Sequence, residues 1–276
     1  MALFAGQGNV GRSMALLWRR SGATPVRTTP GPKPALSVDA VVDAAISLAD
    51  ADGIAAVSMR AVGERLGRSG MALYTYVQSK NELVDLMYDR ALAELPAAYP
   101  QDHWRAALIC WADDLCGFYL RHPWALQMST ARPVLGPHEY AMLNTVLGIL
   151  YRTGLSSTTL RRAVGVLFHF VRGAAQTIAE ARQAPSATGV SDDEWWASRS
   201  MMLEELAPDF AQRFPMVMRL EGARDAPADE PGMRHGGGVP HQEQEARETF
   251  QVGLTVLLDG IDAARARAVA EGPEEG

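Results

Sequence analysis

The sequence predicts an all-α fold, with a small three-helix domain near the N-terminus and a larger helical domain behind it. Apolar residues recur at helical spacing in successive segments, and serine, glycine and proline residues separate these segments. The 276 residues are enough for two domains, and 47% of them are hydrophobic. This composition is typical of a soluble globular protein, and no apolar run approaches the ~18 residues of a membrane span.

The first organised helix is expected to begin after Ser37. One face of residues 38–49 is apolar at i, i+3, i+4, i+7 and i+8, which is the pattern of an amphipathic helix; the residues are Val38, Val41, Val42, Ala45, Ile46 and Ala49. Ser37 can cap the start of this helix, and Gly53 lies where a glycine would end it.

Three further helix starts follow at short intervals. Ser58 is expected to cap a second helix that Gly67 closes, and Ser69 a third helix over residues 70–76. Residues 79–82 form a capping-box sequence that opens a fourth. Three short helices with a tight glycine turn indicate a helix-turn-helix, whose third helix enters the DNA major groove. An ordinary helical bundle with surface tyrosine and arginine fits the pattern alone equally well.

Residues 48–87 resemble the N-terminal domain of the tetracycline-repressor (TetR) family. The most specific portion is Ala72-Leu-Tyr-Thr-Tyr-Val77, followed by Lys80, Glu82 and Leu83. The rest of the chain is similar to the family only in its helical layout. The resemblance implies a transcriptional regulator, and specifically a repressor that binds an inverted-repeat operator as a dimer and responds to a small molecule.

The helix-turn-helix and the resemblance together predict a set of DNA-contacting residues. Arg60 can form a bidentate pair with guanine, and Lys80 at the start of the fourth helix suits a phosphate. Gly70 and Ala72 carry no side-chain hydrogen-bonding group, so specificity must lean on Arg60, the tyrosines and methyl contacts. The predicted residues are Ser58, Arg60, Arg68, Ser69, Gly70, Met71, Ala72, Tyr74, Thr75, Tyr76 and Lys80.

The segment before Ser37 is expected to be a flexible basic arm. It is basic from Arg12 to Lys33, with no acidic residue before Asp39. Such an arm could lie in a flanking minor groove, or it could be a disordered tail with incidental arginines. The glycine pattern of residues 6–11 matches a dinucleotide-binding fingerprint, but no strand precedes it and no βαβ pattern follows.

Proline and glycine breaks divide the larger domain into several expected helices, over residues 102–122, 137–152, 156–183, 191–207, 208–220 and 243–268. The 156–183 helix is apolar on nearly all sides and holds Gly165 and Gly173, so we expect it to pack with the 243–268 helix in a four-helix homodimer interface. The expected domains are an arm (1–36), a helix-turn-helix domain (37–83), an effector-binding and dimerisation domain (84–268, with a mobile loop at about 222–242) and a tail (269–276).

Large apolar side chains in this domain suggest a cavity for a small apolar or aromatic effector, with a few polar anchors. For any single residue, membership of the ordinary core is the competing interpretation. The candidate effector-binding residues are Trp111, Phe118, Trp124, Met128, Tyr140, Asn144, His169, Arg172 and Trp195.

The sequence favours no catalytic function. It contains no H-x-x-x-H or H-E-x-x-H pair, no G-x-S-x-G elbow and no phosphate-binding Walker loop, so we expect no catalytic residue, metal or cofactor. We expect a cytoplasmic protein that joins the nucleoid when bound to its operator, with no membrane partner. The alternatives are a helical adaptor that binds a protein partner without specific DNA affinity, and a helical enzyme.

Overall fold

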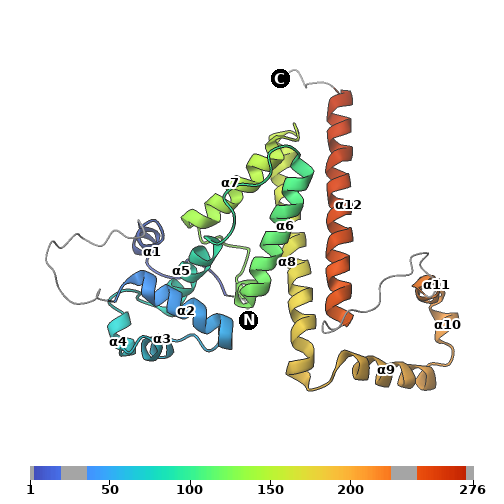
Figure 1. Cartoon of the computed structure of the whole chain (residues 1–276), viewed down its shortest axis with the longest axis horizontal. Coiled ribbons are helices and arrows are strands. Elements are labelled where there is room, and N and C mark those ends of the chain that lie inside the picture. Colours follow the sequence, from blue (N-terminus) through green and yellow to red (C-terminus); the bar gives the residue numbers. More distant parts are fainter. Residues whose placement is uncertain (1–2, 20–35, 225–240, 272–276) are drawn as a thin grey trace. The chain divides into compact units, whose positions relative to one another are not determined.

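The computed structural model describes residues 3–19, 36–224 and 241–271 of the chain, and the regular structure in these ranges is helical (Figure 1). The elements are α1 (Val10–Leu17), α2 (Val38–Asp52), α3 (Met59–Arg65), α4 (Gly70–Leu73), α5 (Lys80–Leu92), α6 (Trp104–Arg121), the 3₁₀ helix η1 (Pro123–Gln127), α7 (Pro137–Tyr151), α8 (Ser157–Thr188), α9 (Asp192–Leu206), α10 (Phe210–Arg213), α11 (Pro215–Arg224) and α12 (His241–Glu271). Two compact units form, one from residues 1–176 and 252–276 and the other from residues 177–251.

Serine side chains cap the N-termini of α2, α3, α4 and α5, as the sequence predicts. Each accepts a hydrogen bond from the backbone N–H three residues later, which satisfies one of the unpaired donors of the first turn; the caps are Ser37, Ser58, Ser69 and Ser79. The predicted capping box at residues 79–82 is only half formed. Glu82 accepts from the backbone N–H of Gln78 at 2.7 Å instead of closing onto Ser79.

Helices α2 to α5 enclose a small apolar core. The predicted inner face of α2 is confirmed at Val41, Val42, Ala45 and Ala49, which are buried. The third predicted helix is shorter than expected, because α4 ends at Leu73 and residues 74–76 form a turn. This turn buries Val77 and brings the chain round to the start of α5.

The N-terminal segment differs from the flexible arm that the sequence predicts. Residues 10–17 form α1, which Asn9 caps, and Ala5, Ser13 and Leu17 are buried. Helix α1 packs against α5. The residues that contact this segment lie far away in the sequence, so its ordered structure could not be predicted from a local pattern. The predicted arm also includes residues 20–35, which lie outside the described residues.

Most of the larger helices follow the predicted boundaries closely. The prediction of one helix over residues 208–220 is wrong, because the chain leaves the helical conformation at Phe214, before Pro215, and forms the separate helices α10 and α11. Helix α8 continues five residues beyond the expected end at residue 183, through Pro185. The expected loop at about 222–242 is bounded by the end of α11 and the start of α12, and residues 225–240 lie outside the described ranges. A Cβ added at Gly165 or at Gly173 would meet no atom of the described residues within 4 Å, so these two glycines leave open space beside α8.

A strong ionic cluster lies in the described part of the unit of residues 177–251. The Glu243 carboxylate, which is buried, accepts hydrogen bonds from Arg182 and Arg247, each at 2.8 Å. These two guanidinium groups hold the pKa of Glu243 below its usual value. Within this unit the cluster fastens the start of α12 to α8.

Candidate DNA-binding surface and ligand cavity

Helices α3 and α4 meet in a tight turn that depends on glycine. Gly67 has a φ of +65°, which L side chains rarely adopt, and it lets the chain reverse after α3. A Cβ on Gly63 would lie 2.8 Å from the carbonyl oxygen of Arg68, and one on Gly70 would lie 3.1 Å from the Cα of Arg60. The two helices are therefore held closer together than side chains would allow, in the arrangement of a helix-turn-helix.

The outer face of this pair is polar at α3 and apolar at α4. The Arg60 side chain is 86% exposed, and its guanidinium Nε lies 2.8 Å from the Glu64 carboxylate, one helical turn away. Glu64 raises the pKa of Arg60 through this hydrogen bond and through its charge. Met71, at the second position of α4, is 77% exposed, and Tyr74 is 45% exposed. The face therefore offers the guanidinium of Arg60, the thioether of Met71 and the phenol of Tyr74 to a neighbouring surface, and Arg68 is also exposed beside it.

A cavity of about 450 Å³ lies in the first unit, between α5, α6, α7, α8 and the segment of residues 128–135. Its apolar lining includes Met142, Leu143 and Phe168. Its polar lining includes Tyr88, Tyr119, Glu139, His169 and Arg172. A mostly apolar cavity of this size with a few polar groups suits a small organic molecule.

Arg172 lines the cavity and holds two neighbouring segments in place. Its guanidinium donates to the carbonyl oxygens of Leu126 and of Met128, the latter at 2.7 Å, and it lies 5.8 Å from the centre of the Tyr119 ring. Burial raises the pKa of Tyr119, and the positive charge of Arg172 opposes this effect. Arg172 therefore fixes the end of η1 and the start of the 128–135 segment.

Glu139 is the acidic group of the cavity. It accepts a hydrogen bond from the backbone N–H of Leu135 at 2.7 Å, which holds the 128–135 segment against α7. Burial raises the pKa of Glu139, and the nearby charges of Asp89 and Asp85 raise it further. Glu139 is therefore a polar anchor that a molecule bound in the cavity can contact.

Comparison with known proteins identifies the chain. Residues 41–87 match the family described as "Bacterial regulatory proteins, tetR family", and residues 95–227 match "Tetracyclin repressor-like, C-terminal domain". The HTH-type transcriptional repressor DrrR1 of Streptomyces coeruleorubidus is 39% identical over 269 residues, which cover 97% of this chain and 91% of that protein. The chain belongs to the TetR family. It is thus related to DNA-binding transcriptional regulators, and the predicted family and all-α fold are confirmed.

Solved structures of other TetR-family proteins share this fold. Apo ActR from Streptomyces coelicolor is 20% identical, with a TM-score of 0.63, and the match covers 86% of this chain and 99% of ActR. ActR in complex with actinorhodin is 22% identical, with a TM-score of 0.62, over 84% of this chain and 97% of that one. A second TetR-family regulator from the same organism is 25% identical, with a TM-score of 0.61, over 84% and 100% of the two chains.

The TetR-type helix-turn-helix gathers the predicted DNA contacts on and beside α3 and α4. Seven of the eleven are exposed and four are half-buried; the exposed ones are Ser58, Arg60, Arg68, Ser69, Met71, Tyr74 and Thr75, and the half-buried ones are Gly70, Ala72, Tyr76 and Lys80. Lys80 lies in the first turn of α5 as expected, with its ammonium group 3.2 Å from the carbonyl oxygen of Ile54.

The structure brings together only part of the predicted effector set. Met128, Tyr140, His169 and Arg172 line the cavity of this TetR-family protein. The other five do not: Trp111, Phe118 and Trp124 are buried in the core, Asn144 is exposed on α7, and Trp195 lies in the unit of residues 177–251. Core and cavity-lining positions share the same helical periodicity, so spacing alone did not separate them.

Sequence reasoning missed several cavity residues. Tyr88 and Tyr119 lie in apolar helix faces but carry a hydroxyl group, which usually needs a hydrogen-bond partner when it is buried. A tyrosine at such a position is a sequence signal that could have indicated a cavity-lining residue. Nothing in the sequence marks the 128–135 segment as a wall, because its position depends on Arg172 and Glu139, which lie on other elements. No helix in the described ranges is long and apolar enough to cross a membrane.

Proposed function

We propose that this chain is a cytoplasmic repressor that binds an inverted-repeat operator as a homodimer and is released by a small apolar or aromatic molecule in the 450 Å³ cavity. The observation that carries the proposal is the pairing of an exposed helix-turn-helix face with an apolar cavity in the same unit. The 39% identity to the repressor DrrR1 supports the direction of regulation. That ActR, a protein of the same fold, binds actinorhodin supports the aromatic class of ligand.

Exposed apolar side chains on α8 and α12 support dimerisation through these helices. Val166 on α8 is 49% exposed, and Val252 and Val256 on α12 are 65% and 63% exposed. Val252 and Val256 are one helical turn apart and so share a face. An apolar face of this kind is stabilised when a second copy covers it. Two copies would then present two α4 helices to successive major grooves.

Operator release tests the ligand part of the proposal. The labelled operator–protein complex is titrated with a panel of planar aromatic compounds that includes actinorhodin, and DNA release is followed by fluorescence anisotropy. We expect at least one compound to release the wild type. We expect the same compound to lose its effect on Gly165→Leu, because Gly165 lines the cavity and has room for a side chain.

Gly148→Leu is the matched control for this experiment. Gly148 also has open space around its Cβ, but it lies on α7 outside the cavity lining, so this variant should respond to the compound like the wild type. Two results would contradict the assigned ligand site. One is release of operator DNA to the same extent from wild type, Gly165→Leu and Gly148→Leu, and the other is no release of DNA by any compound. A footprint shorter than two half-sites on the operator would contradict the dimer.

A further inference from the structure

The N-terminal segment of residues 3–19, which we name the N-terminal strap, is fastened at both ends to the wall of the cavity. At its start, the Leu3 N–H donates to Gln127 at 2.8 Å and the Leu3 carbonyl oxygen accepts from Ser129 at 2.6 Å, so Leu3 pairs with Met128. Near its end, the Trp18 indole N–H donates to the Leu135 carbonyl oxygen at 3.0 Å.

Trp18 also contacts a second residue that lines the cavity. Its ring centre lies 6.1 Å from that of Tyr140, with the planes tilted by 45°. Leu135 and Tyr140 both line the cavity, whereas Trp18 does not, so Trp18 touches the cavity wall from outside. Trp18 and Tyr140 remain about half exposed, at 52% and 47%, which leaves this contact room to change.

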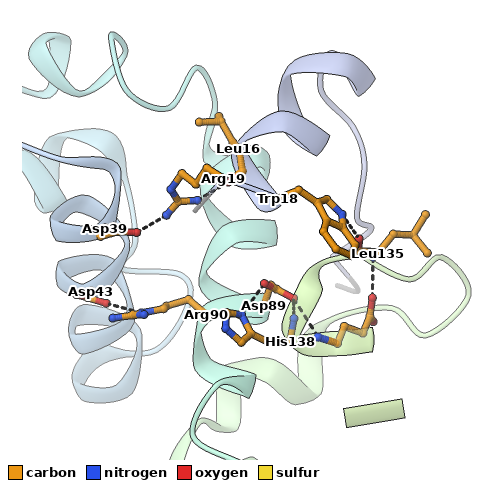
Figure 2. A network of polar contacts seen from close by, with 10 residues as sticks. Leu16, Trp18, Arg19, Asp39, Asp43, Asp89, Arg90, Leu135 and His138 are labelled. Carbon is orange, nitrogen blue, oxygen red and sulfur yellow. Dashed lines mark hydrogen bonds and ion pairs between the residues drawn. The ribbon is translucent and has the colours of Figure 1, made fainter. Parts of the chain in front are cut away.

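The same strap is fastened to the helices of the helix-turn-helix domain. The Gly6 N–H donates to Asp85 on α5 at 2.9 Å, and the Ser13 hydroxyl bonds Glu82 on α5 at 3.2 Å. Arg19, the residue after Trp18, forms an ion pair with Asp39 in the first turn of α2. Figure 2 shows Trp18 directed to Leu135 and Arg19 directed to Asp39.

A second connection between the same regions passes through α5 itself. Asp89 on α5 accepts from the backbone N–H groups of His138 and Glu139 at 2.9 and 3.0 Å, and so caps the start of α7 (Figure 2). This link reaches α5, which packs against α2 and pairs with it through Arg90 and Asp43.

A third connection passes through η1, where Trp124 donates to Asp50 near the end of α2 at 2.7 Å. The strap differs from it in reaching the first turn of α2, through Arg19 and Asp39.

We propose that Trp18 and Arg19 are positioning residues through which the N-terminal strap couples the cavity wall to α2. The proposal rests on the proposed function, because it describes how cavity and operator binding influence each other. A bound molecule that displaces Leu135 or Tyr140 changes the contact of Trp18. Because Trp18 and Arg19 are adjacent, this displacement passes to the ion pair with Asp39 and shifts α2 within the helix-turn-helix domain.

Coupling between two sites is reciprocal, so the strap can be tested from the DNA side without a known effector. Amide hydrogen exchange of the full-length protein is measured with and without its selected operator duplex. In the wild type, we expect the operator to slow exchange in α3 and α4 and to change exchange at residues 128–140 by on the order of fivefold, the lower end of typical coupling.

Two variants break opposite ends of the proposed path. We expect Trp18→Ala and Asp39→Asn each to keep the operator protection of α3 and α4 but to lose the change at residues 128–140. Loss of the change at residues 128–140 in Asp39→Asn is the stronger result. The Asp39 carboxylate pairs with Arg19 of the strap and does not line the cavity, so its replacement disturbs the strap and not the cavity wall. Trp18→Phe, which keeps an aromatic ring for Tyr140, should retain part of the change. Val10→Ala, at a position of α1 that is 73% exposed, should behave like the wild type.

The possible failures are distinguishable. Operator protection of α3 and α4 with no change at residues 128–140 in the wild type would overturn the strap and leave the proposed function standing. So would a change of equal size in wild type, Trp18→Ala and Asp39→Asn, which would assign the coupling to the Asp89 link or to the contact of η1 with Asp50. Absence of any operator protection would overturn the proposed function together with the strap.

Discussion

Asp85 provides a quantitative test of how the N-terminal strap is anchored. Its carboxylate is 5% exposed and accepts the hydrogen bond from Gly6. Burial, opposed by this hydrogen bond and aided by the charge of Glu82, raises the pKa of Asp85 from 3.8 to about 6. Because one pKa unit corresponds to ~1.4 kcal/mol, keeping this carboxylate ionised in the folded protein costs about 3 kcal/mol.

The sign of the pH dependence follows from the direction of the shift. The folded protein binds this proton more tightly than the unfolded chain, so the contribution of Asp85 to stability falls as pH rises from about 4 to about 6. Asp85→Asn keeps an oxygen that can accept from Gly6 but carries no charge. We expect Asp85→Asn to be more stable than wild type by up to about 3 kcal/mol at pH 7.5, with the difference shrinking toward pH 4.

Urea unfolding at one fixed protomer concentration measures this difference across pH, since association also contributes to stability. Asp43→Asn is the control, because Asp43 is half exposed and pairs with Arg90 at the surface. Its stability should stay within ~0.5 kcal/mol of wild type at every pH. A wild type more stable than Asp85→Asn at pH 7.5, or a difference that ignores pH, would refute the reasoning.

Two further predictions concern packing and base recognition. A Cβ at Gly136 would lie 2.1 Å from the Asp89 carboxylate, so Gly136→Ala should lower the free energy of unfolding by about 1–3 kcal/mol. Gly148 lies in an open helical position, so Gly148→Ala should raise the free energy of unfolding by up to ~1 kcal/mol. Equal melting temperatures for the two variants would argue against the Asp89 cap. The exposed Met71 side chain can offer a base only apolar contacts, for example with the methyl group of thymine. Replacing one operator thymine with uracil removes that methyl group and should weaken binding about fourfold, which is ~0.8 kcal/mol. The effect should vanish in Met71→Ala. If no thymine position responds, Met71 does not read a methyl group.

The helix-turn-helix could be predicted from sequence because its signals are local. The serine caps and the spacing of Val41, Val42 and Ala45 act within one or two turns, and the structure confirms them. The TetR-type motif of residues 72–83 then placed these helices in a known arrangement.

The cavity could be predicted only in part, because a cavity is defined by how helices from distant parts of the chain fail to fill a space. Trp111 and Trp124 occupy apolar faces just as Phe168 does, yet Trp111 packs against Phe168 at 5.1 Å and Trp124 bonds Asp50, while only Phe168 lines the cavity. The strap was missed for a related reason. Its glycine-rich start reads as flexible, and its order comes from partners such as Asp85 and Leu135, more than 75 residues away.

Base discrimination by α3 and α4 tests the central claim most directly. Sites are selected from a randomised duplex pool, and the ratio of affinities for selected and scrambled duplexes is measured for wild type, Arg60→Ala, Tyr74→Ala and the charge-matched control Arg161→Ala, at an exposed position of α8. We predict that the wild type discriminates and that Arg60→Ala loses about 1–3 kcal/mol of that discrimination, roughly tenfold in the ratio, while Arg161→Ala loses none. A ratio near one for the wild type, or a ratio that Arg60→Ala and Tyr74→Ala leave unchanged, would contradict the account.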